Sequence, residues 1–281
     1  MRVLVTGGTG VLGRQLVRLL DGKAEVTVLS RRPNLGSGYV RGDLDTGVGL
    51  AAAVDGVDVI AHCASAADYR RPWRDVEGTR RLLEAVDGGR PHVVYISIVG
   101  VDRIPLGYYQ AKLATEQLIQ DSGMPWTVLR TTQFHDLVLT FLMLLTKGPF
   151  TVTPRGFRSQ PVDAGDVAAR MTSMVLSDPA GLVPDFGGPR VESSEETLRV
   201  FLALTRRRRL VLPVWLPGRV ATAFRAGGNL VSAGERGTRT FEEYLRSRIH
   251  SDGSIEPPYQ LKLRRSPRTQ PDAKSRRSRS G

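Results

Sequence analysis

The stretch RVLVTGGTGVLGRQLVRLL, residues 2–20, decides the fold. It starts with a short apolar run, residues 2–6, that has the composition of a buried strand. Glycines follow at positions 7, 10 and 13, and the apolar residues of 11–20 have the spacing of an amphipathic helix. A strand, a glycine turn and a helix in this order are typical of a dinucleotide-binding βα unit.

Each glycine of this turn has its own physical task. Gly7 permits the tight turn, Gly10 lets the backbone approach a pyrophosphate, and Gly13 lets the helix pack closely on the strand. The free N–H groups and the positive dipole end of the helix then face the phosphates. A plain tight turn without a ligand is the alternative. The predicted pyrophosphate-binding residues are Gly7, Thr9, Gly10, Val11, Leu12 and Gly13.

The first half of the chain alternates short apolar runs with helical patterns. Strands are predicted at 2–6, 25–30, 39–41, 57–63, 92–98 and 126–130, and helices at 11–20, 48–54, 75–86 and 108–122. Since the strands are nearly all apolar, we expect helices on both of their faces, as in a parallel sheet. The sequence therefore predicts an α/β fold with a doubly wound Rossmann sheet.

After Arg130 the strands and helices no longer alternate regularly. Helices are predicted at 134–145, 164–176, 194–204, 218–226 and 241–248, and strands at 150–153, 159–162 and 210–213. We interpret them as a small C-terminal α/β lobe. The prediction is one nucleotide-binding domain, residues 1–250, with a substrate lobe formed mainly by residues 131–250.

A large share of the net charge of +12 lies at the end of the chain. Residues 251–281 hold eight Lys or Arg and three Asp or Glu, in a stretch rich in Pro, Ser and Arg. Such a stretch cannot bury a core, so we predict a disordered basic tail. The distribution predicts no specific nucleic-acid site, only weak contact of the tail with an anionic surface.

Other function classes are excluded by composition. Cys63 is the only cysteine, so we expect neither a disulfide framework nor a cysteine-based zinc site, and four scattered histidines predict no other metal site. No apolar run reaches the ~18 to 20 residues of a spanning helix. The first residues predict a strand, not a signal peptide. We therefore expect a cytoplasmic protein that acts on a small molecule.

Two groups of residues in the second half of the chain can either stabilise the fold or bind an anionic partner. The run Arg206–Arg209 follows a predicted helix, where cations complement the carbonyl end, and this is favoured over phosphate or membrane binding. Trp215 and Leu216, with Arg219 and Arg225 nearby, can form an amphipathic surface for anionic lipid. Packing within the lobe is the simpler interpretation.

The end of the second strand predicts the cofactor. An acid there would bind the ribose 2′-OH and favour NAD(H), but Arg31 and Arg32 follow the strand instead. Two arginines can hold a 2′-phosphate, so NADP(H) is preferred and NAD(H) is the alternative. A solvated arginine pair is the other interpretation. Asp43, after the third strand, either accepts the adenine amino group or caps a turn.

A tyrosine and a lysine open the helix at 108–122. Tyr108 and Lys112 are four positions apart and share a helical face. A tyrosine close to a lysine and a nicotinamide can have a lowered pKa and exchange a proton with a carbonyl while hydride moves. Ser97 ends a strand, where its hydroxyl would polarise the same carbonyl. Aromatic packing with a surface lysine is the alternative.

These motifs together carry a family resemblance. TGGTGVLG (6–13), GDL (42–44), HCAS (62–65), YIS (95–97) and YYQAK (108–112) resemble the short-chain dehydrogenase/reductase superfamily. The finer likeness is to its atypical and extended members, the NmrA-like NAD(P)-binding proteins. GMPWTVLR (123–130), TTQF (131–134), QPVD (160–163) and DVA (166–168) are also similar to that group. The likeness covers about residues 1 to 250.

The resemblance implies roles for residues at the carboxyl edge of the sheet. It implies a cofactor site made by Gly7, Gly10, Gly13, Arg31, Arg32, Asp43, Leu44, Ala64 and Lys112. It also implies that Tyr108 and Lys112 are the catalytic pair and that Ser97 is the matching serine. The residues that it brings toward nicotinamide and substrate are Thr132, Gln133 and Phe134. His135, next in the chain, either positions a substrate oxygen or packs in the core.

Three functions remain open at this point. The first is an NADP(H)-dependent oxidoreductase for a small, fairly apolar carbonyl compound or quinone, since the helix 134–145 is almost entirely apolar. The second is a non-catalytic NmrA-like sensor of NADP(H) that binds a protein partner. The third is a nucleotide-sugar epimerase or dehydratase.

Overall fold

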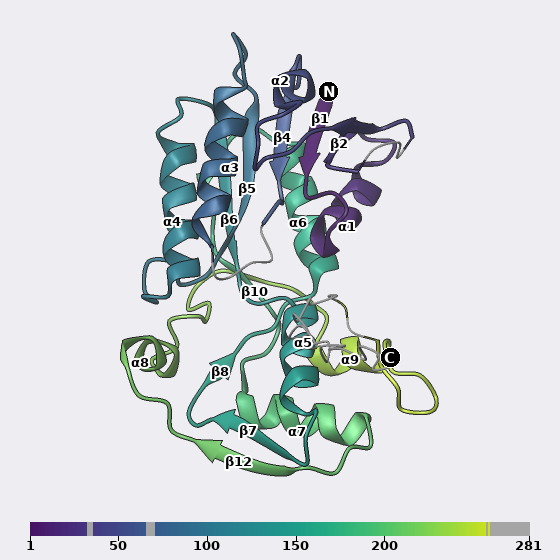
Figure 1. Cartoon of the computed structure of the whole chain (residues 1–281), viewed down its shortest axis with the longest axis vertical. Coiled ribbons are helices and arrows are strands. Elements are labelled where there is room, and N and C mark those ends of the chain that lie inside the picture. The colour runs from purple at the N-terminus through teal and green to yellow at the C-terminus, as the bar shows by residue number, and fades with distance from the viewer. Residues whose placement is uncertain (33–35, 66–70, 257, 259–281) are drawn as a thin grey trace, which may run out of the picture.

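The computed structural model describes residues 1–32, 36–65, 71–256 and 258 (Figure 1). Its centre is a nine-stranded sheet in the order β13-β10-β6-β5-β4-β1-β2-β3, in which β9 also pairs with β6. Each pairing in this sheet is parallel. The strands are β1 (Arg2–Thr6), β2 (Glu25–Ser30), β3 (Tyr39–Arg41), β4 (Val59–His62), β5 (His92–Ile98), β6 (Trp126–Thr131), β9 (Gly181–Leu182), β10 (Phe186–Gly187) and β13 (Glu235–Arg236).

The direction of winding reverses between β1 and β4. From β1 the chain builds outward through β2 and β3, and from β4 it builds the other way through β5 and β6. At such a switch point an open parallel sheet leaves a crevice beyond the carboxyl ends of its strands, where ligands bind. The doubly wound Rossmann fold expected from the sequence is confirmed.

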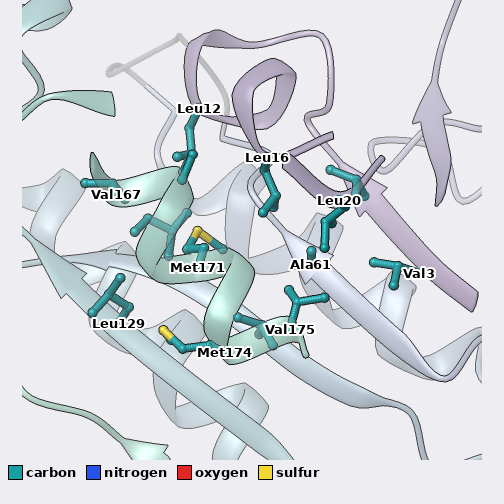
Figure 2. Packing of buried hydrophobic residues seen from close by; sticks show 14 of the residues in the cluster. Val3, Leu12, Leu16, Leu20, Ala61, Leu129, Val167, Met171, Met174 and Val175 are labelled. Carbon is teal, nitrogen blue, oxygen red and sulfur yellow. The ribbon is translucent and has the colours of Figure 1, made fainter. Parts of the chain in front are cut away.

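Helices cover both faces of the sheet, as the apolar strands require. α1 (Val11–Leu20) and α6 (Ala164–Val175) share a buried cluster on one face. α2 (Leu50–Val54), α3 (Trp73–Glu84) and α4 (Gly107–Gln120) cover the other face. Figure 2 shows the first cluster, whose labelled residues include Val3, Leu12, Leu16, Leu20, Ala61, Met171 and Val175. This packing fixes α1, and with it the glycine turn, against the sheet.

A group of further helices and strands, from the described chain after β6, lies below the carboxyl edge of the sheet (Figure 1), and we call this group the lobe. Its helices are α5 (His135–Leu145), α7 (Ser194–Leu204), α8 (Arg219–Arg225) and α9 (Phe241–Arg246). Two small sheets complete it: β7 (Phe150–Pro154) beside β12 (Leu210–Val214), and β8 (Arg158–Ser159) beside β11 (Glu192–Ser193). α5, α7 and α9 share a second core that includes Leu139, Phe201 and Phe241.

The structure differs from the sequence prediction in the short strands. The strand expected at 159–162 is observed as the two-residue β8, and Val162 forms a single bridge with Phe134. The two-residue strands β9, β10, β11 and β13 carry no periodicity that a sequence pattern can show. The predicted tail beyond residue 258 lies outside the described residues. Among the helices of the described ranges, none combines the length and the apolar character needed to cross a bilayer.

Candidate cofactor and active site

The glycine turn has the geometry of a phosphate cradle. Gly7 has φ +69°, and a Cβ there would lie 2.7 Å from the Ala64 nitrogen, because the chain after β4 passes directly beneath the turn. A Cβ on Gly13 would overlap the carbonyl oxygen of Gly7. Gly10 is the N-cap of α1 and supplies no side-chain cap. The first N–H groups of α1 therefore face the crevice uncapped, which fits a dinucleotide pyrophosphate.

A buried histidine connects the turn to the rest of the site. His62 Nδ1 lies 2.6 Å from Thr6 Oγ1, and His62 Nε2 lies 2.8 Å from Thr79 Oγ1. The Thr79 hydroxyl donates to the Asp75 carbonyl, so it accepts from His62 Nε2–H, and Nδ1 accepts from Thr6. Burial and then the charge of Lys112 lower the pKa of His62 to about 3. His62 is therefore a neutral spacer between β1, β4 and α3.

The residues predicted to bind adenosine and its 2′-phosphate follow β2 and β3. Arg31 and Arg32 are exposed directly after β2, and Arg31 Nη1 lies 3.9 Å from Asp45 Oδ2. The Asp43 carboxylate accepts from the Asp45 N–H at 3.0 Å and so caps the turn that follows β3. Leu44 packs against Gly78 of α3. One carboxylate oxygen of Asp43 therefore caps a turn, as the second of the two interpretations expected.

The tyrosine hydroxyl is the start of a short hydrogen-bond chain. Tyr108 Oη lies 2.9 Å from Ser65 Oγ, and Ser65 Oγ donates to Asp75 Oδ2 at 2.7 Å. Because a serine hydroxyl has one proton, Ser65 accepts the hydrogen bond from Tyr108. The chain therefore runs from Tyr108 at the start of α4 through Ser65 to a carboxylate on α3.

Lys112 lies behind this chain, almost fully buried. Its Nζ donates to the Ile96 carbonyl at 3.4 Å and lies 4.8 Å from the centre of the Tyr95 ring. Burial disfavours the ammonium, but the interactions with Tyr95, Tyr108 and Asp75 outweigh it and hold the pKa of Lys112 above its ordinary value. The site thus contains a buried cation whose charge interacts with Tyr108 and Asp75.

Ser97 lies at the expected strand end but in a different environment. Its side chain is 2% exposed, and its Oγ has no hydrogen-bond partner among the described residues. The serine that the structure places against Tyr108 is Ser65. The catalytic role of Ser97 stays a prediction.

The three residues predicted to approach nicotinamide and substrate, Thr132, Gln133 and Phe134, each make a different contact. Thr132 donates to the Gln160 carbonyl, and Gln133 Nε2 donates to Tyr109 Oη at 3.1 Å. Gln133 Oε1 is buried and lacks a partner within the described ranges. Phe134 is the N-cap of α5 and packs on the cluster beneath α1 and α6.

His135 is fully buried in the lobe core. Its Nε2 donates to the Arg239 carbonyl at 3.0 Å, and its ring packs against Phe241 and Tyr244. Burial lowers the pKa of His135. These contacts favour the packed-residue interpretation.

Three residues of this site were not assigned a role from the sequence: His62, Ser65 and Asp75. His62 and Ser65 belong to the quoted HCAS motif, so the position of that motif after a strand was the available signal. Asp75 had none, because it approaches Ser65 only through the packing of α3. No group of metal-binding side chains was found in the described part of the chain.

Sequence comparisons find a matching protein family and several relatives of this chain. A family model described as NAD(P)H-binding matches residues 7–178. An uncharacterised protein of Mycobacterium tuberculosis is 32% identical over 187 residues, 63% of this chain and 20% of that protein. The (4-alkanoyl-5-oxo-2,5-dihydrofuran-3-yl)methyl phosphate reductase of Streptomyces griseus is 29% identical over 147 residues, 50% of each chain. The chain thus spans half or less of the length of these relatives.

Solved structures show the same fold. The NADPH-dependent quinone oxidoreductase of Escherichia coli, crystallised with NADPH, matches with a TM-score of 0.72 and 17% identity, over 87% of this chain and 99% of that one. A nucleoside-diphosphate-sugar epimerase of Staphylococcus aureus matches with a TM-score of 0.72 and 14% identity, over 88% of this chain and 100% of that one. At such identities the likeness shows the fold alone.

Proposed function

The chain belongs to the NAD(P)H-binding family, and on this premise we propose that it is an NADP(H)-dependent oxidoreductase that reduces a small, fairly apolar carbonyl compound or quinone. The observation that carries the proposal is the position of Tyr108, hydrogen-bonded through Ser65 to Asp75 and interacting with the charge of buried Lys112. A protein that only bound the dinucleotide would need the glycine turn but not this arrangement.

The residues of the chain divide the chemistry between them. When bound, the nicotinamide supplies a hydride. Tyr108 donates its hydroxyl proton to the substrate oxygen, and the Lys112 ammonium stabilises the phenolate that remains. Ser65 accepts from the Tyr108 hydroxyl and so fixes its direction before the substrate binds. Phe134, at the start of the apolar α5, borders the substrate side.

The cofactor preference rests on the end of β2. Arg31 and Arg32 supply two exposed guanidinium groups at the position where an acid would select NAD(H). Among the described residues, Arg31 forms a distant ion pair with Asp45, at 3.9 Å, and the Arg31 side chain is 74% exposed. A 2′-phosphate can therefore replace Asp45 as the partner of Arg31 without breaking a buried contact, which supports NADP(H).

One observation favours a second candidate, the NADP(H) sensor. Ser97, the hydroxyl expected to polarise the carbonyl, is closed off from solvent. A site without that group can retain cofactor binding while turning over nothing. The likeness to the epimerase structure supports only the fold, so the nucleotide-sugar reaction has no separate support.

The test is NADPH oxidation, followed by stopped flow with a panel of carbonyl compounds and quinones. Tyr108→Phe is expected to lower turnover at least ~100-fold, because it removes the general acid. Tyr39→Phe, on the exposed edge strand β3, is the matched control and should behave as the wild type. Unchanged turnover in Tyr108→Phe would remove this residue from the mechanism. Tight NADPH binding by a wild type that turns over no compound would favour the sensor.

A further inference from the structure

The outer face of the β7–β12 pair is apolar, and none of the described elements covers it. Its side chains are Phe150 and Val152 from β7, and Leu210 and Leu212 from β12, with exposed fractions of 58, 42, 57 and 42%. The parallel register sets Leu210 beside Phe150 and Leu212 beside Val152, so the four share one face. Figure 1 shows the two strands at the end of the molecule opposite α2.

In this small sheet the polar side chains face inward and the apolar side chains face outward, which is the reverse of an ordinary sheet with one solvent-exposed face. On the inner side, toward α7, Thr151 and Thr153 are each 2% exposed, and both hydroxyls lack a hydrogen-bond partner within the described residues. The threonines are thus buried while the large apolar side chains face outward. A half-buried strand normally has the opposite arrangement, so the outer face is expected to be covered by something else.

Cations lie at one end of this apolar face, because exposed Lys147 and Arg208 come just before β7 and β12 and the two strands are parallel. A groove of about 630 Å³ between α7 and β12 is lined by Arg199, Arg206, Arg207 and Arg208, but Val211 and Pro213 also line it, so it lies on the inner side of the pair. Arg207 and Arg209 are used in the fold, because both donate to Thr146 at the carboxyl end of α5. Arg199, Arg206 and Arg208 are exposed, and exposed Lys147 lies just before β7.

We infer that this face docks peripherally on a bilayer that contains anionic phospholipid. The apolar side chains enter the acyl boundary, and the cations at the amino ends of the two strands, Lys147 and Arg208, contact the phosphate headgroups. A second copy of the chain fits less well, since a symmetric pairing through the apolar face would bring the two sets of cations together. Trp215, 63% exposed at the end of β12 with the Arg225 guanidinium over its ring, adds the kind of side chain that is enriched at bilayer interfaces.

Vesicle cosedimentation of the full chain tests the inference, with phosphatidylcholine vesicles that contain or lack phosphatidylglycerol. Wild type is expected to bind the vesicles with phosphatidylglycerol and to bind the others weakly. Phe150→Ser/Leu210→Ser should lower the partition coefficient at least tenfold, because two apolar side chains no longer insert. Leu176→Ser/Leu182→Ser, at exposed positions on the nucleotide-binding part, is the matched control and should bind as the wild type.

A charge series tests these cations. Lys147→Gln/Arg208→Gln should weaken binding to the anionic vesicles about tenfold or more, because each lost cation near the surface weakens the attraction severalfold. Arg18→Gln/Arg80→Gln removes the same charge from exposed positions on α1 and α3 and should have little effect. The basic residues beyond 258 are present in every variant, so their contribution cancels in the comparison.

Three outcomes overturn the inference. The first is a wild type that binds neither kind of vesicle. The second is a Phe150→Ser/Leu210→Ser variant that binds as well as its control, since attraction by charge alone would then explain binding. The third is a wild-type dimer in analytical ultracentrifugation that this variant converts to a monomer, because the face would then be an interface between copies. NADPH affinity should stay constant throughout, which confirms that the variants are folded.

Discussion

The hydroxyl oxygens of Ser65 and Tyr108 lie 2.9 Å apart, although 43 positions separate the two residues. One follows β4 and the other begins α4, so only the parallel pairing of β4 and β5 and the packing of α3 and α4 bring them together. Ser65 donates its hydroxyl hydrogen bond to Asp75, so the Tyr108 proton points toward Ser65. In the proposed function, a substrate oxygen would replace Ser65 as the acceptor of that proton.

The first prediction compares the two serines. Ser65→Ala is expected to lower kcat for NADPH-dependent reduction about tenfold or more, because Tyr108 loses the partner that orients it, while NADPH affinity stays the same. The measurement is steady-state kinetics with any substrate found in the panel. Ser97→Ala is the matched variant and should affect kcat less. The opposite order would show that Ser97, not Ser65, assists the tyrosine.

The second prediction concerns the cofactor preference. Arg31→Ala/Arg32→Ala should weaken NADPH binding about tenfold or more and leave NADH binding almost unchanged, because only NADPH carries the 2′-phosphate. Isothermal titration with both dinucleotides measures this. Arg18→Ala/Arg80→Ala controls for the loss of two positive charges elsewhere. An unchanged ratio of the two affinities would end the assignment of the 2′-phosphate to this arginine pair.

The third prediction concerns the glycine turn. A Cβ on Gly13 would overlap the Gly7 carbonyl, so Gly13→Ala should destabilise the fold by about 1–3 kcal/mol and weaken binding of both dinucleotides. Gly89→Ala, where the nearest atom to a new Cβ is 3.6 Å away, is the control. Thermal unfolding with and without NADPH measures both effects. Normal NADPH binding in Gly13→Ala would contradict the cradle geometry.

The fourth prediction is a pH dependence of stability. Burial and the charge of Lys112 lower the pKa of His62 to about 3, from an ordinary value of 6.5. Between these two values the unfolded chain binds a proton that the folded chain does not, so the contribution of His62 is full above pH 6.5 and is lost as the pH falls toward 3. In this window His62→Gln should flatten the slope of unfolding free energy against pH by up to ~1.4 kcal/mol per pH unit.

Denaturant unfolding at a series of pH values measures that slope. His250→Gln, which replaces an exposed histidine, is the control and should keep the slope of the wild type. If the unfolding free energies of the wild type and of His62→Gln change in parallel between pH 6.5 and 3, His62 binds its proton equally well in the folded and the unfolded chain, and the prediction is wrong.

Local patterns predicted the parts of the fold that have long periodic elements. β1, α1, β2, β5 and α7 have the predicted bounds, because each is a largely apolar run or an amphipathic helix with a clear start, and the short edge strand β3 also has its predicted bounds. The two-residue strands were missed, since β10 and β13 form only where the folded chain returns to the edge of the sheet. No local pattern encodes that return.

Only part of the candidate site could be predicted from the sequence. The glycines, Tyr108 and Lys112 have fixed spacings that a helix or turn converts directly into geometry. Ser65 and Asp75 act through a contact between β4 and α3, and their distance is set by how α3 packs. The position of His135 after β6 left open a role at the substrate or in the core, and in the structure α5 turns its ring into the lobe core.

The sheet is finished by chain that comes from the second half of the molecule. β6, the last long strand, has its outer edge paired by β9 and β10, and β10 is in turn paired by β13 at residues 235–236. A fragment that stopped at residue 178, the end of the family match, would leave that edge open to strands of other molecules. The nucleotide-binding part therefore depends on the second half of the chain to close the edge of its own sheet.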